Sequence, residues 1–259
     1  MEFGICLLSI VPMRREASDK SEMVNQLLFG DLVLIEERKD DWLFIRKAFD
    51  NYEGWMDIKQ IEVLGEQEFY SLNKTKANYI SDLANVIEDK TSKFFIPVVL
   101  GSTIRDITND NFKISGKDFQ YSGILVSGNQ PPTFNTIYET ALLFLNAPYL
   151  WGGISPFGID CSGFIQTVYK LVGINLLRDA SQQATQGEQI SLIEEAKPGD
   201  LLFFDNQEGN IVHVGIMLND KKIIHASGKV RIDSVDHQGI YNRDLKKYTH
   251  SLRLIKRIL

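Results

Sequence analysis

Residues 158–164 read Gly158-Ile159-Asp160-Cys161-Ser162-Gly163-Phe164, and they mark the start of a helix. Asp160 is a good N-cap, so we expect the helix to begin at Cys161 and to run to Lys170, with Gly173 as its C-terminal stop. Cys161 would then lie in the first turn, where backbone N–H groups point outward. Such groups lower a thiol pKa from about 8.5 and can hold an oxyanion. The position favours a nucleophilic thiolate.

A base for this nucleophile is expected in a strand over residues 211–218. Apolar residues alternate there, which places His213 with Gly215 on the less apolar face. Gly215 would leave space beside the imidazole for a substrate or an approaching thiolate. His225 follows on the next predicted strand, and an antiparallel hairpin would bring the two imidazoles together. His225 could then orient His213, as the third member of a catalytic set does.

Each of these signals has a plainer explanation when it is taken alone. A cysteine at a helix start is more often a buried small residue than a nucleophile. A zinc site is the main chemical alternative, but one cysteine and two histidines lack a clear fourth ligand, and we expect no metal. His237 and His250 have no comparable setting and are assigned surface or structural roles, and Cys6 is assigned to core packing.

The composition bounds the class of protein. The chain has 259 residues, 44% hydrophobic and 24% charged, which is typical of a soluble globular protein of two or three domains. The net charge of −6 provides no broad basic field, so nucleic acid is not expected as a partner. Cys6 and Cys161 are expected to be thiols. No stretch reaches the roughly 20 apolar residues that span a bilayer, and the start lacks a signal-like order of charges. We expect a cytoplasmic protein without a membrane partner, or a periplasmic one if a signal has been removed.

The N-terminal half is predicted to contain one or two small barrels. Short apolar runs between polar turns in residues 1–64 are typical of strands in such a barrel. Residues 66–93 have Tyr79, Leu83, Val86 and Ile87 at helical spacing, which predicts a helical segment. Strand-like runs return at 95–100, 112–114 and 123–126, so residues 65–130 are expected to form a helical segment and a second small barrel.

The best domain boundary is Gln130-Pro131-Pro132, because paired prolines stop regular structure. Residues 131–259 are expected to form one α+β domain. A helix ending near Pro148 and the helix from Cys161 come first. Strands over 200–204, 211–218, 222–227 and 251–258 follow.

Several spaced motifs resemble the signature of the NlpC-type bacterial cell-wall cysteine peptidases, which have a papain-like fold. The motifs are Tyr149-Leu150-Trp151-Gly152-Gly153, the segment 158–164, Pro198-Gly199-Asp200-Leu201-Leu202-Phe203-Phe204, His213-Val214-Gly215-Ile216 and Ile224-His225-Ala226-Ser227. The resemblance spans roughly residues 131–259. It implies that Cys161 attacks, that His213 is the base and that His225 orients it.

Residues 21–30 and Tyr52-Glu53-Gly54-Trp55 resemble the bacterial SH3-like domain of one branch of this family. That branch cleaves γ-D-glutamyl-L-diamino acid bonds in murein peptides and requires a free N-terminal L-alanine. The resemblance implies that Glu22, Tyr52 and Asp160 bind the substrate ammonium. It also implies that Tyr149, Trp151, Ser162 and the segment Asp179-Ala180-Ser181 contact the substrate, although this branch can have serine where Ala180 stands.

Together, the motifs and the resemblance predict a hydrolase that releases L-Ala-γ-D-Glu from murein stem peptides by thiol acyl transfer, without a cofactor. A monomer that recycles imported wall peptides is the expected form. Two alternatives remain open: an amidase or acyltransferase with the same triad, and a murein-binding protein whose catalytic domain is idle.

Overall fold

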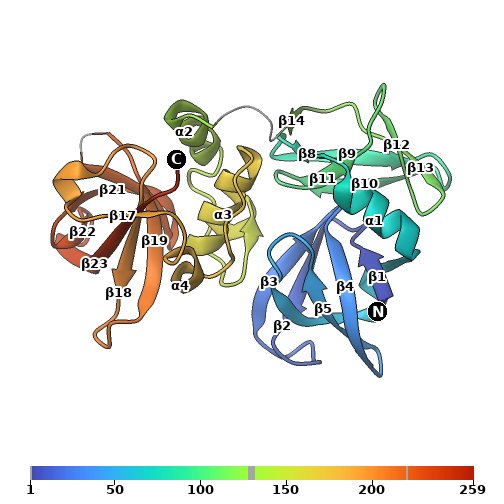
Figure 1. The fold of residues 1–259 in the computed structure, drawn as a ribbon, viewed down its shortest axis with the longest axis horizontal. Coiled ribbons are helices and arrows are strands. Elements are labelled where there is room, and N and C mark those ends of the chain that lie inside the picture. The colour runs from blue at the N-terminus through green and yellow to red at the C-terminus, as the bar shows by residue number, and fades with distance from the viewer. Residues whose placement is uncertain (1, 128–131, 220) are drawn as a thin grey trace. The chain divides into compact units, whose positions relative to one another are not determined.

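The computed structural model describes residues 2–127, 132–219 and 221–259. The chain divides into two compact units, Met1–Gly128 and Asn129–Leu259 (Figure 1). Gln130 and Pro131, at the predicted domain boundary, lie outside the described residues.

The first unit begins with a seven-stranded antiparallel sheet in the order β3-β2-β6-β5-β4-β1-β7. Alternation of apolar and polar residues builds it; in β5, for example, every second side chain is buried. The inward set forms a core of Val11, Met13, Leu27, Val33, Leu43, Ile45 and Met56 together with Cys6. The strands are β1 (Glu2–Ile5), β2 (Ile10–Arg14), β3 (Met23–Leu28), β4 (Leu32–Lys39), β5 (Trp42–Lys47), β6 (Glu53–Asp57) and β7 (Glu62–Leu64), with a 3-10 turn η1 (Ile58–Gln60).

The predicted helical segment over 66–93 is wrong beyond its first third. The helix α1 spans only Glu66–Lys74, and residues 77–80 and 84–89 form strands β8 (Ala77–Ile80) and β9 (Ala84–Asp89). The apolar residues at helical spacing do not share one face, because Ile87 is buried whereas Leu83 and Val86 are about half exposed. Pairing between strands, which local spacing does not reveal, overrides the helical period.

Residues 77–127 form two small sheets, β10-β9-β13-β12 and β11-β8-β14. Their remaining strands are β10 (Phe94–Val99), β11 (Thr103–Arg105), β12 (Asn111–Ile114), β13 (Lys117–Gln120) and β14 (Leu125–Ser127). These sheets share one hydrophobic core with the first sheet and α1, in which Phe3, Leu32, Phe69, Phe112 and Phe119 are all buried. The shared core explains why residues 1–128 behave as a single unit.

The second unit places its helices before its main sheet. α2 (Phe134–Leu142) packs on α3 (Cys161–Leu171), and a short helix α4 (Ala180–Gln183) follows. A two-stranded ribbon, β15 (Ile154–Ser155) and β16 (Gly158–Ile159), leads into α3. The main sheet has β17 (Glu188–Ile190), β18 (Leu201–Asp205), β19 (Ile211–Met217), β20 (Lys222–Ser227), β21 (Lys229–Asp236), β22 (Gly239–Asn242) and β23 (Lys247–Arg257), with a 3-10 turn η2 (Ile193–Glu195).

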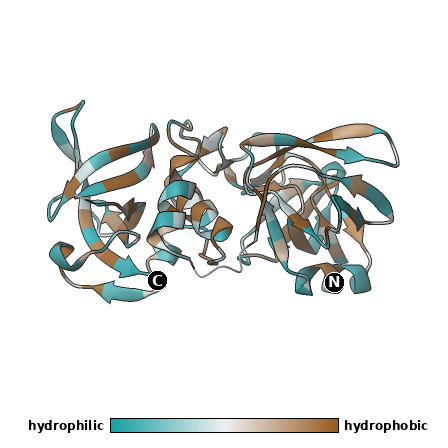
Figure 2. Cartoon of the chain, turned by 90° about the horizontal axis from the view of Figure 1, so that it is seen from above, coloured by the Kyte–Doolittle hydropathy of each residue, from teal (hydrophilic) through white to brown (hydrophobic). Residues whose placement is uncertain are grey.

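The main sheet closes into a barrel. Its strand order is β17-β23-β18-β19-β20-β21-β22, and an additional β22–β23 pairing joins β18–β23 into a ring. One apolar cluster receives buried side chains from all six of these strands, among them Leu202, Met217, Ile223, Val235, Ile240 and Ile255. This cluster therefore fills the barrel interior. Hydrophobic and hydrophilic residues alternate along the barrel strands (Figure 2).

Four of the barrel strands lie where strands were predicted, but β17, β21 and β22 were not predicted. The sequence of β21 does not indicate which of its residues are buried. Ile232 is exposed there, whereas its neighbour Asp233 is buried at 4% exposure. A strand whose charged residues point inward does not show the usual apolar alternation.

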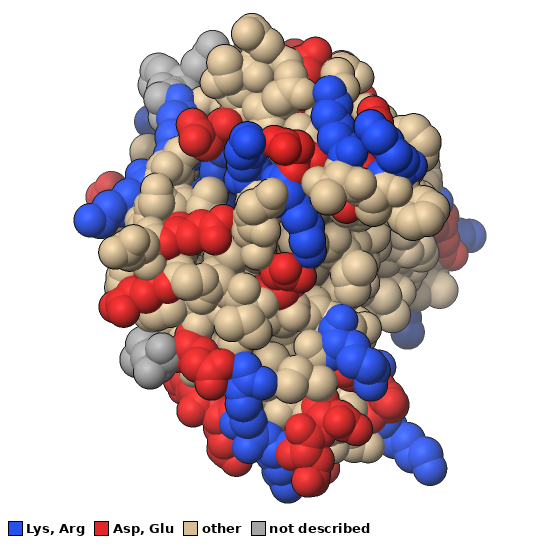
Figure 3. Space-filling view, turned by 90° about the vertical axis from the view of Figure 1, so that its right-hand side faces the viewer, with Lys and Arg blue, Asp and Glu red and all other residues tan. Residues whose placement is uncertain are grey.

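In the described part of the chain, no helix is long and apolar enough to cross a membrane. On the face drawn in Figure 3, lysine and arginine side chains are interspersed with aspartate and glutamate, and they do not merge into one basic patch.

Candidate active site

Cys161 is the first residue of α3, and its position is fixed by the cap before it. The Asp160 Oδ1 atom accepts a hydrogen bond from the Gly163 amide at 2.7 Å. Every residue of α3 is buried, and α3 packs against β19, the strand that carries His213. The Cys161 thiol lies 4.0 Å from the carbonyl oxygen of Val212, the residue just before His213.

Close backbone approach around this helix start requires glycine. A Cβ atom on Gly163 would lie 2.3 Å from the Gly153 carbonyl oxygen, and one on Gly153 would lie 2.3 Å from that of Gly158. Glycine at these two positions lets the loop before α3 and the first turn of α3 pack backbone against backbone.

Two imidazoles meet inside the barrel. His213 lies directly opposite Phe204 of the barrel core, and Gly215 lies opposite His225. Because facing residues in a ladder share one side of the sheet, both histidines point into the barrel. The His213 Nε2 atom lies 2.8 Å from His225 Nδ1. The hairpin therefore brings together the two histidines that the sequence singled out.

The polar chain continues beyond His225. The His225 Nε2 atom lies 3.0 Å from Asp233 Oδ2, and Arg231 pairs with the same carboxylate. Arg231 also reaches the exposed Asp244 at 2.9 Å. A series of hydrogen bonds and ion pairs thus connects the predicted base His213 to the exposed side chain of Asp244.

His250 stacks on the predicted base, which the sequence did not indicate. Its ring centroid lies 4.2 Å from that of His213, with an interplanar angle of 24°. Burial, with a smaller contribution from the neighbouring His225, lowers the pKa of His250 to about 4. A neutral aromatic ring therefore covers one face of His213.

The space beside Gly215 is filled, contrary to the expectation that it leaves room for substrate. A Cβ atom on Gly215 would lie 2.6 Å from the Ile223 side chain and 2.9 Å from His225 Cβ. The glycine instead allows β20 to approach closely enough for His225 to reach His213.

The Cys161 thiol does not have the lowered pKa that its position at the helix start predicts. Burial raises the pKa of the Cys161 thiol to about 12, and the Asp160 carboxylate adds to the rise, while Arg178 and the Ser162 amide act in the opposite direction. The pKa of His213 lies well below its usual range, because burial and the adjacent imidazoles disfavour its charged form. The resting pair is therefore a neutral thiol and a neutral imidazole, and the helix start alone does not produce a thiolate.

Asp160 is held by more than the helix that it caps. Arg178 donates to both of its carboxylate oxygens, at 3.0 and 2.6 Å, and the Gly152 amide donates to Oδ2 at 2.8 Å. Arg178 also donates to Ser162 Oγ at 3.0 Å, and its side chain is 1% exposed. This buried ion pair joins the start of α3 to the segment before α4.

The other predicted substrate residues are distributed over both units. Near the thiol, Tyr149 is half-buried, and its pKa is raised to about 12 by burial and then by the charges of Cys161 and Asp160, whereas Trp151 is 60% exposed. Asp179 precedes α4, in which Ala180 is buried and Ser181 is exposed. In the first unit, Glu22 accepts from Arg15 at 2.6 Å, and Tyr52 is half-buried against the core of the first sheet.

Sequence reasoning missed four residues of this network. They are Arg178, Arg231, Asp233 and His250. Arg178 directly precedes the predicted substrate segment Asp179-Ala180-Ser181, and a long basic side chain beside an acidic cap was an available signal. Arg231 and Asp233 lie on β21, which pairs with the strand of His225, and His250 lies on β23, which the barrel brings to the histidines from far along the chain.

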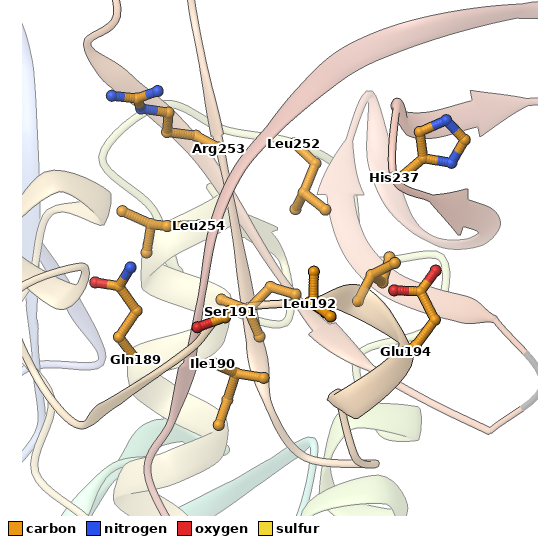
Figure 4. A pocket seen from close by; sticks show the side chains of 11 residues that line it. Gln189, Ile190, Ser191, Leu192, Glu194, His237, Leu252, Arg253 and Leu254 are labelled. Carbon is orange, nitrogen blue, oxygen red and sulfur yellow. The ribbon is translucent and has the colours of Figure 1, made fainter.

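A pocket of about 250 Å³ lies away from the histidines in this unit, between Gln189–Glu194 and Leu252–Ile255 (Figure 4). Leu252 and Ile193 are among its apolar lining residues. Glu194 and His237 lie at one side of it (Figure 4). None of the predicted site residues lines it. Among the residues described here, no group of three or more His, Cys, Asp or Glu side chains could hold a metal ion.

Each unit contains a segment that matches a known protein family. Residues 146–249 match the NlpC/P60 family, and residues 13–61 match the bacterial dipeptidyl-peptidase SH3 domain. A crystal structure of an NlpC/P60 family protein from Bacillus cereus shares the fold, with a TM-score of 0.83 over 99% of both chains at 21% identity.

Curated relatives cover most of the chain. Gamma-D-glutamyl-L-lysine dipeptidyl-peptidase of Bacillus subtilis is 34% identical over 78% of this chain and 71% of that protein. Dipeptidyl-peptidase 6 of Lysinibacillus sphaericus is 31% identical over 93% of this chain and 95% of that protein. With its capped cysteine, its histidine pair and its SH3 domain, the chain belongs to the NlpC/P60 family and is a cysteine-type peptidase with a papain-like catalytic fold.

Proposed function

We propose that this peptidase hydrolyses the γ-D-glutamyl-L-diamino acid bond of murein stem peptides with a free N-terminal L-alanine, and releases L-Ala-γ-D-Glu. The observation that carries the proposal is the similarity to two dipeptidyl-peptidases over 78% and 93% of this chain. One of them is named for the γ-D-glutamyl-L-lysine bond. The similarity includes the SH3 domain over residues 13–61, so it is not confined to the catalytic unit.

The proposed reaction needs only the groups already described. Cys161 Sγ attacks the γ-carbonyl carbon of D-glutamate while His213 accepts the thiol proton. Amides of the first turn of α3 stabilise the oxyanion. His213 then gives its proton to the amine of the leaving diamino acid, and a thioester remains. Water, deprotonated by His213, attacks the thioester, so that the dipeptide leaves and the thiol is restored.

The choice of a free amine would come from Glu22, Tyr52 and Asp160. Carboxylates and a phenol oxygen favour an ammonium ligand, and they disfavour an acylated amine that would leave these oxygens unpaired. Asp160 already accepts two hydrogen bonds from Arg178. Glu22 likewise accepts from Arg15, and we propose that the two carboxylates share the substrate ammonium. Tyr149, Trp151, Ser162 and Asp179 to Ser181 would contact the rest of the dipeptide.

Further parts of the proposal concern the setting of the enzyme. We propose that it works as a monomer in the cytoplasm on imported wall peptides, with a periplasmic location as the alternative, and that it needs no cofactor or nucleic acid. Intact wall would be a poor substrate, because its L-alanine amine is blocked by the glycan.

Mass spectrometry of peptide digestion tests the substrate. L-Ala-γ-D-Glu-diaminopimelate, its lysine counterpart and the N-acetylated form of each are incubated with the enzyme and with Cys161→Ala. We expect L-Ala-γ-D-Glu from the free peptides only, and no product from the variant. Equal cleavage of free and acetylated peptides would overturn the amine requirement. Transfer of the acyl group to an added amine in place of water would instead support an acyltransferase.

A further inference from the structure

We propose that Asp233 is a positioning residue that determines which nitrogen of the base His213 is free to accept a proton. Asp233 lies on β21 with its side chain buried in the barrel, and its Oδ2 atom is 3.0 Å from His225 Nε2. Its hydrogen-bond partners are His225 and Arg231, and neither is predicted to contact the substrate. Its effect would be exerted through His225.

The direction of two hydrogen bonds determines which nitrogen of each imidazole carries the proton. An ionised carboxylate only accepts, so the proton between Asp233 and His225 must lie on His225 Nε2. A neutral His225 then has a bare Nδ1, which must accept from His213 Nε2 at 2.8 Å. A neutral His213 that carries its proton on Nε2 has a bare Nδ1. That nitrogen is the one left to take the proton of Cys161.

Arg231 keeps Asp233 in the acceptor-only state. Its Nη2 atom donates to Asp233 Oδ1 at 2.9 Å, and its Nε atom lies 2.7 Å from Oδ2. Burial alone would raise the pKa of Asp233, but hydrogen bonds from His225 and Arg231 outweigh it and hold the pKa below its usual range. The second partner of Arg231, Asp244, is exposed and helps to hold the guanidinium in place.

Burial leaves His213 and His225 dependent on each other and on Asp233 for their hydrogen bonds. The exposed fractions are 5% for His213, 1% for His225 and 4% for Asp233, so water cannot readily replace a lost partner. A donor in place of the Asp233 oxygen would favour the opposite tautomers. His213 Nδ1 would then carry a proton and could not act as the base. Such a change of tautomer, caused by replacing a buried aspartate with asparagine, lowers kcat by about four orders of magnitude in a serine protease triad.

Nitrogen NMR of the unliganded full-length protein tests the inference without a substrate. Couplings from the ring carbon protons identify each histidine nitrogen as protonated or bare. We expect His213 and His225 both to be protonated on Nε2 and bare on Nδ1 near neutral pH. A proton on Nδ1 of either ring would overturn the proposal, whatever bond the enzyme cleaves.

Variants test the path through His225. Asp233→Asn should shift part of both rings to the opposite tautomer, and it should slow alkylation of Cys161 by iodoacetamide about 10- to 100-fold, followed by mass mapping. On an active peptide substrate, kcat should fall by a similar factor with KM nearly unchanged. Asp244→Asn, which alters only the exposed partner of Arg231, is the matched control and should change either rate less than about twofold.

A double-mutant cycle separates positioning from general stability. In a His225→Gln background, Asp233→Asn should change the alkylation rate by less than about twofold, because the imidazole that it orients is gone. A purely structural role would leave the effect of Asp233→Asn undiminished in that background, and that result would refute the inference.

Discussion

Arg178 and Asp160 form a buried, two-pronged ion pair directly behind the nucleophile, with nitrogen to oxygen distances of 3.0 and 2.6 Å. Asp160 caps the helix that presents Cys161, and its negative charge raises the pKa of the thiol beside it. Arg178 opposes that rise. The cap that positions the cysteine therefore disfavours its thiolate, and the ion pair limits this cost.

Removal of this arginine should be strongly destabilising. Arg178→Leu leaves the Asp160 carboxylate buried without its counterion, and the free energy of unfolding should fall by about 3–5 kcal/mol in urea titrations. Arg253→Gln is the matched control, because its pair with Asp205 is long at 3.6 Å and its side chain is 62% exposed. The control should change stability by no more than about 1 kcal/mol. Equal effects of the two variants would contradict the role of the buried pair.

The resting thiol should be protonated at neutral pH. Since burial raises the pKa of Cys161 to about 12, the ultraviolet absorbance of thiolate should be absent near pH 7 and should grow only in strongly alkaline solution. The difference between the enzyme and Cys161→Ala isolates this residue from Cys6. A thiolate signal at neutral pH that disappears in His213→Ala would show a preformed ion pair and refute the neutral pair described above.

His250 should make the protein less stable in acid. Its pKa is lowered from 6.5 to about 4, so between these values the unfolded chain binds a proton that the folded chain does not. The free energy of unfolding must then fall as the pH drops through this window. His250→Phe removes this share while it keeps an aromatic ring on His213, so its stability should fall less steeply in acid.

The matched control for this experiment is His237→Phe, because His237 is exposed. Urea titrations of the three proteins at several pH values across the window give the slopes directly. If His250→Phe lost stability in acid as steeply as the unmodified protein, His250 would not be one of the groups that take up the proton.

Alanine at position 163 should be harmful although the position is helical. Gly→Ala in a helix interior ordinarily stabilises by about 1 kcal/mol. Here the new Cβ would lie 2.3 Å from the Gly153 carbonyl oxygen, so the first turn of α3 must shift. Gly163→Ala should lower the melting temperature and should slow Cys161 alkylation. Gly65→Ala, where nothing lies within 4 Å of the new atom, should leave both unchanged.

The sequence by itself determined the parts of this protein that depend on near neighbours in the chain. Asp160 caps the helix that Cys161 begins, and the hairpin of β19 and β20 carries His213 and His225, because an N-cap and a short hairpin are specified within a few residues. The alternation of buried and partly exposed residues in the first sheet, as in β5, was predictable for the same reason. Local spacing failed at residues 77–89, where pairing with distant strands decided the conformation.

Only the tertiary structure decided the surroundings of the catalytic pair. His250 reaches the imidazoles because β23 pairs with β18 and β22, which are long-range contacts with no local signature. Asp233 lies on β21, the strand next to His225, and its charged side chain is buried in the barrel. Burial inside that barrel sets the protonation of His213, since desolvation depends on everything packed around a group and not on its neighbours in sequence. Local sequence thus indicated the residues proposed as nucleophile and base, and the fold sets the protonation of both.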